Sequence, residues 1–213
     1  MTVVALVPVT GRTGQFGDIL DSLLESVLNN LLAADCVDLA CVVVPPSEVD
    51  TVEKTITSFV EKPIHVIGVE KSAFESMNSI VASALPAIRS LVSTAEVSTV
   101  LVHGPRHAYA PPELIRQVVA EIQAGAPSVV PVLPCTDTVK ELDATGVIID
   151  TPNRATLRVT QSPIGFAARL WPVEQPWAEL PPGTRTIPGH PAARAIRTSF
   201  DLAFARDSAK EPR

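Results

Sequence analysis

Three short segments in the second half of the chain, residues 136–140, 151–154 and 161–166, carry side chains suited to binding a phosphate group. An arginine such as Arg154 can donate two hydrogen bonds to one phosphate, and a threonine hydroxyl such as that of Thr138 adds a neutral one. Ordinary alternatives remain: a solvent-exposed arginine in a turn, a threonine that favours a strand and, for Lys140, a solvated strand lysine.

A second set of candidate residues lies near the N-terminus and in the centre of the chain. Gly11 and Gly14 flank Arg12, and residues 103–107 read His-Gly-Pro-Arg-His. Backbone amides of a glycine-rich turn can form a nest that binds an anion. A tight turn between a strand and a helix explains the same glycines, so this signal is weak on its own.

The elements that must position these residues follow from hydrophobic periodicity. Apolar runs of strand length alternate with longer segments of helical spacing, which predicts a largely parallel sheet built from βαβ units. We expect strands at residues 3–9, 39–44, 64–69, 97–103 and 128–133. We expect helices at residues 19–33, 47–59 with Ser47 as the cap, 74–91, from Pro111-Pro112 to a stop at Gly125, and near 199–206.

This order of elements predicts the α/β class, a three-layer α/β/α Rossmann-like domain whose ligands bind beyond the carboxyl ends of the strands. Short alternating segments after Pro134 predict a protruding β-arm over about residues 136–160. The stretch from residue 171 is rich in proline, and Trp171 and Trp177 are expected to anchor it by packing. Because no internal repeat is present, residues 1–213 are expected to form a single domain.

Composition limits the class of protein. The chain has 213 residues, of which 46% are hydrophobic, enough for one sizeable core. A net charge of -6 without a block of lysine or arginine argues against nucleic acid or an anionic membrane as a partner. We expect a cytoplasmic protein, because no apolar run has transmembrane length and the N-terminus lacks the features of a signal peptide. Cys36 and Cys41 are expected to be small core residues.

Taken together, the motifs resemble the 2-C-methyl-D-erythritol 4-phosphate cytidylyltransferase family of the non-mevalonate isoprenoid pathway. Residues 130–134 and 137–140 match its Pro-Val-x-Asp-Thr-[Ile/Val]-Lys element. Residues 151–166 follow its Thr-Pro-x-Arg…Leu…Gln-[Ser/Thr]-Pro-x-x-Phe order. Residues 101–103 match the strand that enters its His-Asp-Ala-Ala-Arg loop. The resemblance covers nearly the whole chain.

The resemblance implies a nucleotidyltransferase in which methylerythritol phosphate attacks the α-phosphorus of CTP, while Mg²⁺ and cationic side chains stabilise the charge that develops. Thr138, Lys140 and Arg154 correspond to contacts with the phosphosugar. In the family the arm interlocks with a neighbouring subunit, so a homodimer through the β-arm is implied. Contacts with the nucleotide are implied for Pro8, Val9, Gly11, Gly14, Ser79 and His103.

Three positions depart from the family pattern. The loop after the first strand lacks the Pro-Lys turn, and Arg12 is the nearest substitute for the family's cations there. Gly104 replaces the metal-binding aspartate, and glycine has no oxygen ligand for Mg²⁺, so no metal ligand is assigned. Ala195 replaces a lysine, with Arg197 facing the same side if the backbone is extended.

Loss of several charge stabilisers predicts weak or absent turnover, because one such group commonly contributes about a hundredfold in rate. Two hypotheses remain open. The chain is either a divergent cytidylyltransferase in which Arg12, Arg106 and His107 compensate for the losses, or a non-catalytic paralogue. Such a paralogue would keep the phosphate-binding arm and act as a binding or regulatory partner of an active enzyme.

Overall fold

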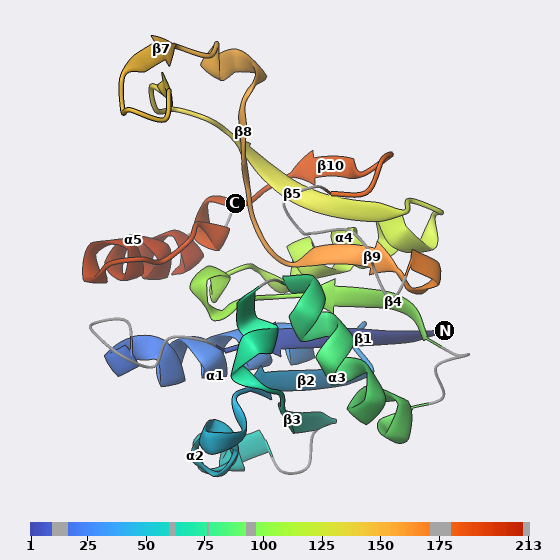
Figure 1. Ribbon diagram of the computed structural model, residues 1–213. Helices are drawn as coiled ribbons and strands as arrows, with labels where there is room; N and C mark the ends of the chain where they lie inside the picture. The colour runs from blue at the N-terminus through green and yellow to red at the C-terminus, as the bar shows by residue number, and fades with distance from the viewer. Residues whose placement is uncertain (10–16, 60–62, 76, 93–96, 171–179, 211–213) are drawn as a thin grey trace.

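A mainly parallel β-sheet forms the centre of the protein (Figure 1). The computed structural model describes residues 1–9, 17–59, 63–75, 77–92, 97–170 and 180–210. The main sheet has eight strands in the order β10-β5-β9-β4-β1-β2-β3, and β8 pairs with β5 beside this path. Its strands are β1 (Thr2–Pro8), β2 (Leu39–Val44), β3 (Ile64–Gly68), β4 (Val97–Val102), β5 (Ser128–Pro134), β8 (Arg158–Thr160), β9 (Ile164–Ala167) and β10 (Arg185–Pro188).

The centre of the sheet is parallel, as the sequence predicts. β1 pairs in parallel with both β2 and β4, so that Leu6 lies beside Cys41 on one side and Val102 on the other. All six residues of β2 are buried, which is the pattern of a strand covered on both faces. The five predicted strands are confirmed, with ends that differ by at most one residue from those expected.

β9 and β10 were not expected from the sequence. β9 runs antiparallel between β4 and β5, and β10 adds a parallel edge strand beside β5. Each has only four residues, which is too short to show a clear alternation of apolar and polar side chains. β9 also contains Gly165, where a Cβ would lie 2.5 Å from Cγ1 of Val118. Helix α4 therefore packs directly on the backbone of this strand.

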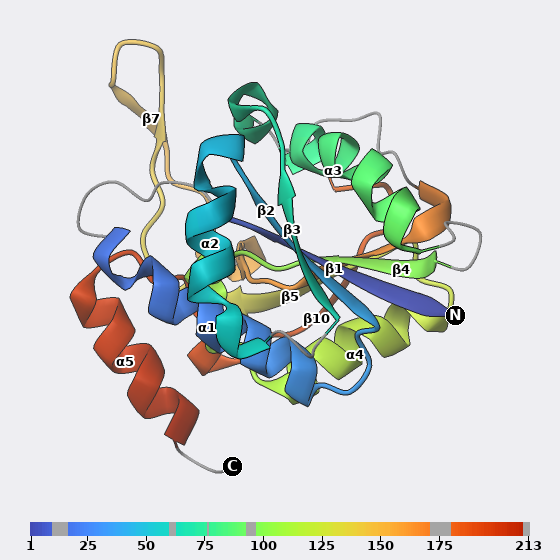
Figure 2. The ribbon, with the colours of Figure 1, turned by 90° about the horizontal axis from the view of Figure 1, so that it is seen from below.

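Helices cover both faces of the sheet (Figure 2). They are α1 (Gly17–Ala33), α2 (Val49–Thr55), α3 (Met77–Leu91), α4 (Pro112–Gln123) and α5 (Ser199–Lys210). One core lies under α1, α2, α4 and the inner side of α5, and the other lies under α3. This arrangement confirms the α/β class and the three-layer order, in the mixed form created by β9.

The predicted helix over residues 47–59 is wrong in its start and its continuity. A 3-10 turn (Pro46–Glu48) precedes α2, which begins at Val49, and a second 3-10 turn (Thr57–Phe59) follows it. Glu48 occupies the cap position and no side chain caps the helix, so Ser47 does not have the predicted role. Pro46 fixes the tight turn before the helix can start. The last helix is longer than expected and extends to Lys210.

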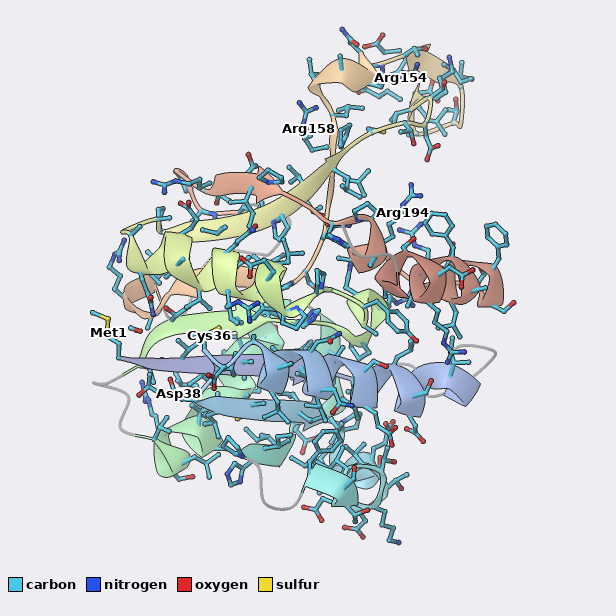
Figure 3. The ribbon with its side chains drawn as sticks, turned by 180° about the vertical axis from the view of Figure 1, so that it is seen from behind. Met1, Cys36, Asp38, Arg154, Arg158 and Arg194 are labelled. Carbon is cyan, nitrogen blue, oxygen red and sulfur yellow. The ribbon has the colours of Figure 1, made fainter. Side chains whose placement is uncertain are left out.

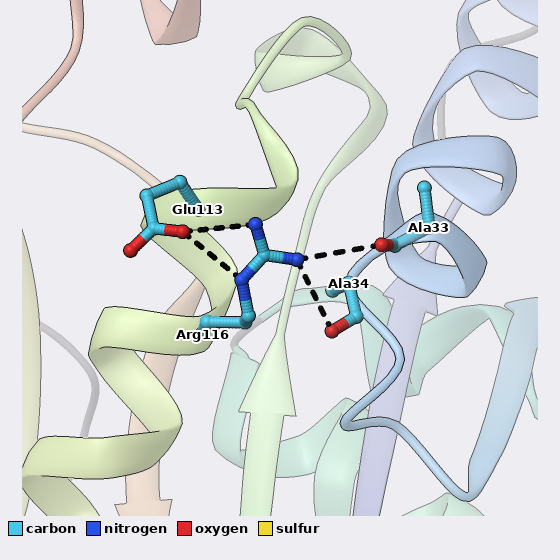
Figure 4. A network of polar contacts seen from close by, with 4 residues as sticks. All are labelled: Ala33, Ala34, Glu113 and Arg116. Atoms are coloured by element: carbon cyan, nitrogen blue, oxygen red, sulfur yellow. Dashed lines mark hydrogen bonds and ion pairs between the residues drawn. The ribbon is translucent and has the colours of Figure 1, made fainter.

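Arg116 of α4 ties two of the helices on one face together (Figure 4). Its guanidinium donates to the carbonyl oxygens of Ala33 and Ala34 at 3.5 and 3.4 Å, just where α1 ends. The same group donates to Oε2 of Glu113 through Nε at 3.0 Å and Nη2 at 2.8 Å. The contact satisfies carbonyl groups that a helix leaves free at its last turn.

The arm is confirmed as a protrusion from the sheet (Figure 1). At its end β6 (Glu141–Leu142) and β7 (Ile148–Asp150) form a separate two-stranded sheet. β8 carries the chain back to the main sheet by pairing with β5. Every residue from 138 to 150 is exposed. The expected tryptophan anchors, Trp171 and Trp177, lie outside the described residues.

Cys36 and Cys41 lie in or against the core, as the sequence predicts. Cys41 is fully buried, and its burial raises the pKa of the thiol to about 12, which agrees with a core residue. Cys36 is half-buried and packs against the core under α1. Among the described helices, none is both long and apolar enough to cross a membrane.

Candidate active site

The carboxyl ends of β1 and β4 meet at one edge of the sheet, where Pro8, Val9 and His103 lie. The amide of Val9 donates to the carbonyl of Val43 at 2.9 Å, and that of His103 donates to the carbonyl of Leu6 at 2.9 Å. The side chain of Val9 is fully buried in the core. Any contact of Val9 with a nucleotide therefore has to use its backbone carbonyl.

His103 is fully buried at the end of β4. Its Nδ1 lies 2.8 Å from Oγ of Ser162, and its Nε2 has no hydrogen-bond partner among the described residues. Burial, with a smaller contribution from the nearby His107, lowers the pKa of His103 to about 3, so the ring is neutral at neutral pH. The side chain thus links β4 to the segment that enters β9. Within the described ranges its ring makes no hydrogen bond to the backbone, which was the ordinary role expected for a histidine at a strand end.

Arg106 and His107 follow on a 3-10 turn (Pro105–His107). The carbonyl of Arg106 accepts a hydrogen bond from the amide of Ile196 at 2.7 Å, and Nδ1 of His107 donates to the carbonyl of Ala193 at 2.8 Å. The side chain of Arg106 is exposed. These bonds hold the segment before α5 against the end of β4.

The charges at this junction are positive. Burial is the largest cause of the lowered pKa of His107, its bond to Ala193 opposes the shift, and the guanidinium groups of Arg197 and Arg106 lower the pKa further. Both arginines are therefore close enough to His107 to act on it electrostatically. This end of the sheet can stabilise an anion.

A cavity of about 640 Å³ opens between the base of the arm and the segment that leads into α5. Ala195 and Arg197 both line it, while Ile196 between them is fully buried. This alternation confirms that Arg197 faces the same side as Ala195. Other lining residues are Asp137, Thr160, Gln161 and Arg194.

Two local structures fix the walls of this cavity. Thr198 and Asp201 form a reciprocal cap at the start of α5, because the amide of Asp201 donates to Oγ1 of Thr198 and the amide of Thr198 donates to Oδ2 of Asp201. Gln161 is nearly fully buried and bonds both the amide and the carbonyl of His190 at 2.9 Å. The spacing of threonine and aspartate before an apolar residue was the available signal for the cap.

The predicted phosphosugar contacts lie together on the arm. Nη1 of Arg154 donates to the carbonyl of Thr136 at 3.0 Å, and Nζ of Lys140 donates to Oγ1 of Thr151 at 2.8 Å. Thr138, two residues before Lys140, is exposed. Figure 3 shows Arg154 on the projecting arm and Arg194 on the body beside α5. Within one chain, the arm residues are thus set apart from the strand ends.

The remaining predicted nucleotide contacts are only partly described. Ser79 lies in the first turns of α3, whose start follows β3 at the same edge of the sheet as His103. Gly11, Arg12 and Gly14 lie outside the described residues.

Comparisons with known proteins identify the family of this chain. The family model described as 2-C-methyl-D-erythritol 4-phosphate cytidylyltransferase matches residues 9–174. The chain belongs to this cytidylyltransferase family. A relative with that name from Saccharopolyspora erythraea is 35% identical over 96% of this chain and 98% of its own length. One from Nocardia farcinica is 33% identical over 96% and 92%.

Solved structures support the cytidylyltransferase fold. The crystal structure of 4-diphosphocytidyl-2C-methyl-D-erythritol synthase from Anaerococcus prevotii aligns with a TM-score of 0.72 and 16% identity over 99% of both chains. The 2-C-methyl-D-erythritol 4-phosphate cytidylyltransferase from Thermus thermophilus aligns with a TM-score of 0.66 and 19% identity over 99% of this chain and 100% of its own. At these identities the likeness concerns the fold alone.

Cytidylyltransferases of this family use a divalent metal. The residues at the end of β4 do not fit Mg²⁺, because Gly104 has no side chain and its neighbours Arg106 and His107 are cationic or nitrogen-bearing. In the described part of the chain, no group of three or more His, Cys, Asp or Glu side chains could hold a metal ion. The described residues at the end of β4 thus offer no set of ligands for Mg²⁺.

Proposed function

We propose that this protein binds CTP and 2-C-methyl-D-erythritol 4-phosphate and that its turnover by the family reaction is weak or lost. In that reaction a phosphate oxygen of methylerythritol phosphate forms a bond to the α-phosphorus of CTP. The bond from this phosphorus to the bridging oxygen of the β-phosphate breaks, and pyrophosphate leaves. The family assignment over nearly the full chain supports the substrates, and they remain a proposal for this chain.

Gly104 is the observation that carries the proposal of weak turnover. It stands at the end of β4, where the family motif has an aspartate, and it supplies no negative charge to balance a metal ion or a cationic loop. Ala195, which lines the cavity, likewise offers no charge in place of the family lysine. Removing one preorganised charge commonly lowers kcat by about a hundredfold or more.

Arg106, and Arg12 in the glycine-rich loop, are the candidate catalytic cations. Arg106 is favoured by its position beside His107 and by the bond that joins its carbonyl to Ile196 at 2.7 Å. In this role its guanidinium would stabilise negative charge on the phosphates of CTP as the bond breaks. Pro8, Val9, Gly11, Gly14, Ser79 and His103 remain the proposed surroundings of the nucleotide.

A homodimer through the β-arm is part of the proposal. Leu142, Val147, Ile148 and Ile149 on the arm are each more than half exposed, at 55–59%, and such a cluster is typical of an interaction surface. A second copy could bring Thr138, Lys140 and Arg154 to the strand ends, from which Arg154 of the same chain is set apart. Light scattering of the purified protein would show a dimer, and Ile148→Asp would shift it to a monomer.

The experiment that tests turnover is release of pyrophosphate from CTP and methylerythritol phosphate with Mg²⁺ at high protein concentration. Release above background that disappears in Arg154→Ala would establish a divergent enzyme. A folded protein without release would contradict catalysis on these substrates.

The second candidate function is a non-catalytic paralogue that binds a phosphosugar and regulates an active enzyme through the arm. Gly104 and Ala195 favour it, because both changes remove charge from the reacting centre and leave the arm intact. Calorimetry would then show binding of the phosphosugar without turnover.

A further inference from the structure

The cavity beside α5 contains a pair of cations that the family pattern does not assign. Arg194 and Arg197 both line it, from the segment between the 3-10 turn (Pro191–Ala193) and the cap of α5. Both residues are exposed, so their guanidinium groups can be reached by a ligand. The two arginines and the cavity are contributed by one chain.

Among the described side chains, neither guanidinium lies within 4.0 Å of a carboxylate oxygen, although Arg197 is close enough to Asp201 to contribute to the lowered pKa of that carboxyl. The guanidinium of Arg194 lies 5.7 Å from the ring centre of Phe204, a contact that leaves its hydrogen-bond donors available. The amide of Arg197 donates to Oδ2 of Asp201 at 3.0 Å, but this bond uses the backbone. The positive charge of Arg197 also reaches His107, where it contributes to the lowered pKa.

Two carboxylates, those of Asp137 and Asp201, line the cavity, and that of Asp201 already accepts hydrogen bonds within the chain. Oδ2 of Asp201 accepts hydrogen bonds from the amides of Arg197 and Thr198 and from the hydroxyl of Thr198. These bonds and, to a smaller extent, the charge of Arg197 lower the pKa of Asp201, whose carboxylate lies at the start of α5. Asp137 at the base of the arm is exposed and is the remaining acid. The wall next to α5 is thus the cationic side of the cavity.

We infer that Arg194 and Arg197 bind the phosphate monoester of the sugar substrate in this cavity and so replace the cation missing at Ala195. This inference rests on the proposed function for the identity of the sugar. A phosphate monoester carries close to two negative charges at neutral pH, which two guanidinium groups can balance, and arginine matches its oxygen atoms with paired donors. Thr160 and Gln161 line the facing wall and complete the enclosure.

The cavity suits the sugar phosphate better than the triphosphate for reasons of position. It lies at the base of the arm, against the ends of β5 and β8, whereas the nucleotide is expected at the ends of β1 and β4. β9 separates β5 from β4 in the sheet. Phe200 and Phe204 add an apolar wall against which the carbon chain of a small polyol can lie.

The test is calorimetric binding of methylerythritol phosphate to the full-length protein in a chelating buffer without added metal. The dephosphorylated alcohol, methylerythritol, serves as the second probe. We expect Arg197→Ala and Arg194→Gln each to weaken binding of the phosphate by about tenfold to a hundredfold, the range for a hydrogen bond to a charged group. The matched control is Arg89→Ala, a change at the end of α3 on the other side of the sheet, and it should leave affinity unchanged.

The outcomes separate this inference from the proposed function. Binding that needs both the phosphate and the two arginines supports the inference even if no pyrophosphate is released. Equal binding of the alcohol, unchanged affinity in both variants, or absence of binding to the wild type would overturn it. If the enzyme turns over and KM for the phosphosugar is unchanged in both variants, the proposed function stands and the inference fails. Circular dichroism of each variant excludes unfolding as the cause of lost binding.

Discussion

Replacing Gly104 with aspartate should restore a charge that the chemistry lacks. The structure leaves room for it, because a Cβ at this position meets no atom within 4 Å. The backbone angles, φ -74° and ψ 147°, are ordinary for any L-residue. Gly104→Asp is therefore expected to change the free energy of unfolding by less than about 1 kcal/mol. Any change should be stabilising, because replacing glycine lowers the conformational entropy of the unfolded chain.

The expected gain in rate follows from the electrostatic role of such a group. A carboxylate at this position would face the cationic turn that carries Arg106 and His107, and it could supply the oxygen ligand that Mg²⁺ requires. One preorganised stabiliser contributes on the order of a hundredfold, or about 3 kcal/mol of the barrier. Because Ala195 would still lack its charge, we expect an increase of roughly ten- to a hundredfold, dependent on Mg²⁺.

The assay is pyrophosphate release from CTP and methylerythritol phosphate, with and without Mg²⁺, for the wild type, Gly104→Asp and Gly104→Asn. The asparagine variant has the same shape without the charge and should remain at the wild-type rate. One alternative arrangement has to be considered, because the new carboxylate could instead accept hydrogen bonds from the free amides at the start of the 3-10 turn (Pro105–His107). An aspartate variant that melts normally, binds both substrates and shows no Mg²⁺-dependent gain would refute the reasoning.

The fold yields three further predictions. Arg116→Ala should lower the free energy of unfolding by about 1 kcal/mol through loss of its bonds between α1 and α4, and an unchanged urea midpoint would contradict this. Gly165→Ala should cost about 1–3 kcal/mol because the new methyl group meets Val118. A melting temperature equal to that of the wild type would show that α4 shifts freely. Since the pKa of His103 is lowered in the folded state to about 3, the unfolded state binds the proton more readily between that value and the ordinary pKa near 6.5. Stability should thus fall as pH decreases below about 6.5. Urea titrations should show this loss in the wild type, and His103→Gln should reduce it.

The central strands could be predicted from the sequence because burial on both faces leaves a plain signal. β2 consists of six buried residues, and β1 is nearly the same. Such runs need no partner to be recognised. β9 could not be found in this way, because its place depends on tertiary contacts. Gly165 has no side chain that could contribute to a pattern of alternating apolar and polar residues. Its small size instead lets α4 pack closely on the strand.

The site was predictable in its parts and not in its assembly. The motifs placed Thr138, Lys140 and Arg154 on an arm, and the arm is there. A nucleotide contact was implied for His103, and nothing in the sequence indicated that its ring is fully buried and bonded to a serine 59 positions away in the chain. Only the pairing of β4 with β9 brings those two side chains together. A long-range contact of this kind leaves no mark in local spacing.

The roles proposed for the positions that depart from the family differ from those proposed for the retained positions. Gly104 and Ala195 belong to groups that would stabilise charge as the phosphorus–oxygen bond breaks, so their loss is expected to lower kcat. The arm and the arginines beside α5 are proposed to bind the phosphate of the sugar, which is already charged in the ground state. Because binding that is equal in the ground and transition states affects KM without affecting kcat, this protein is expected to hold its phosphosugar well while transferring the cytidylyl group slowly. Both candidate functions include the bound phosphosugar. Gly104→Asp separates them, because the restored charge can raise the rate only if the protein also binds the nucleotide.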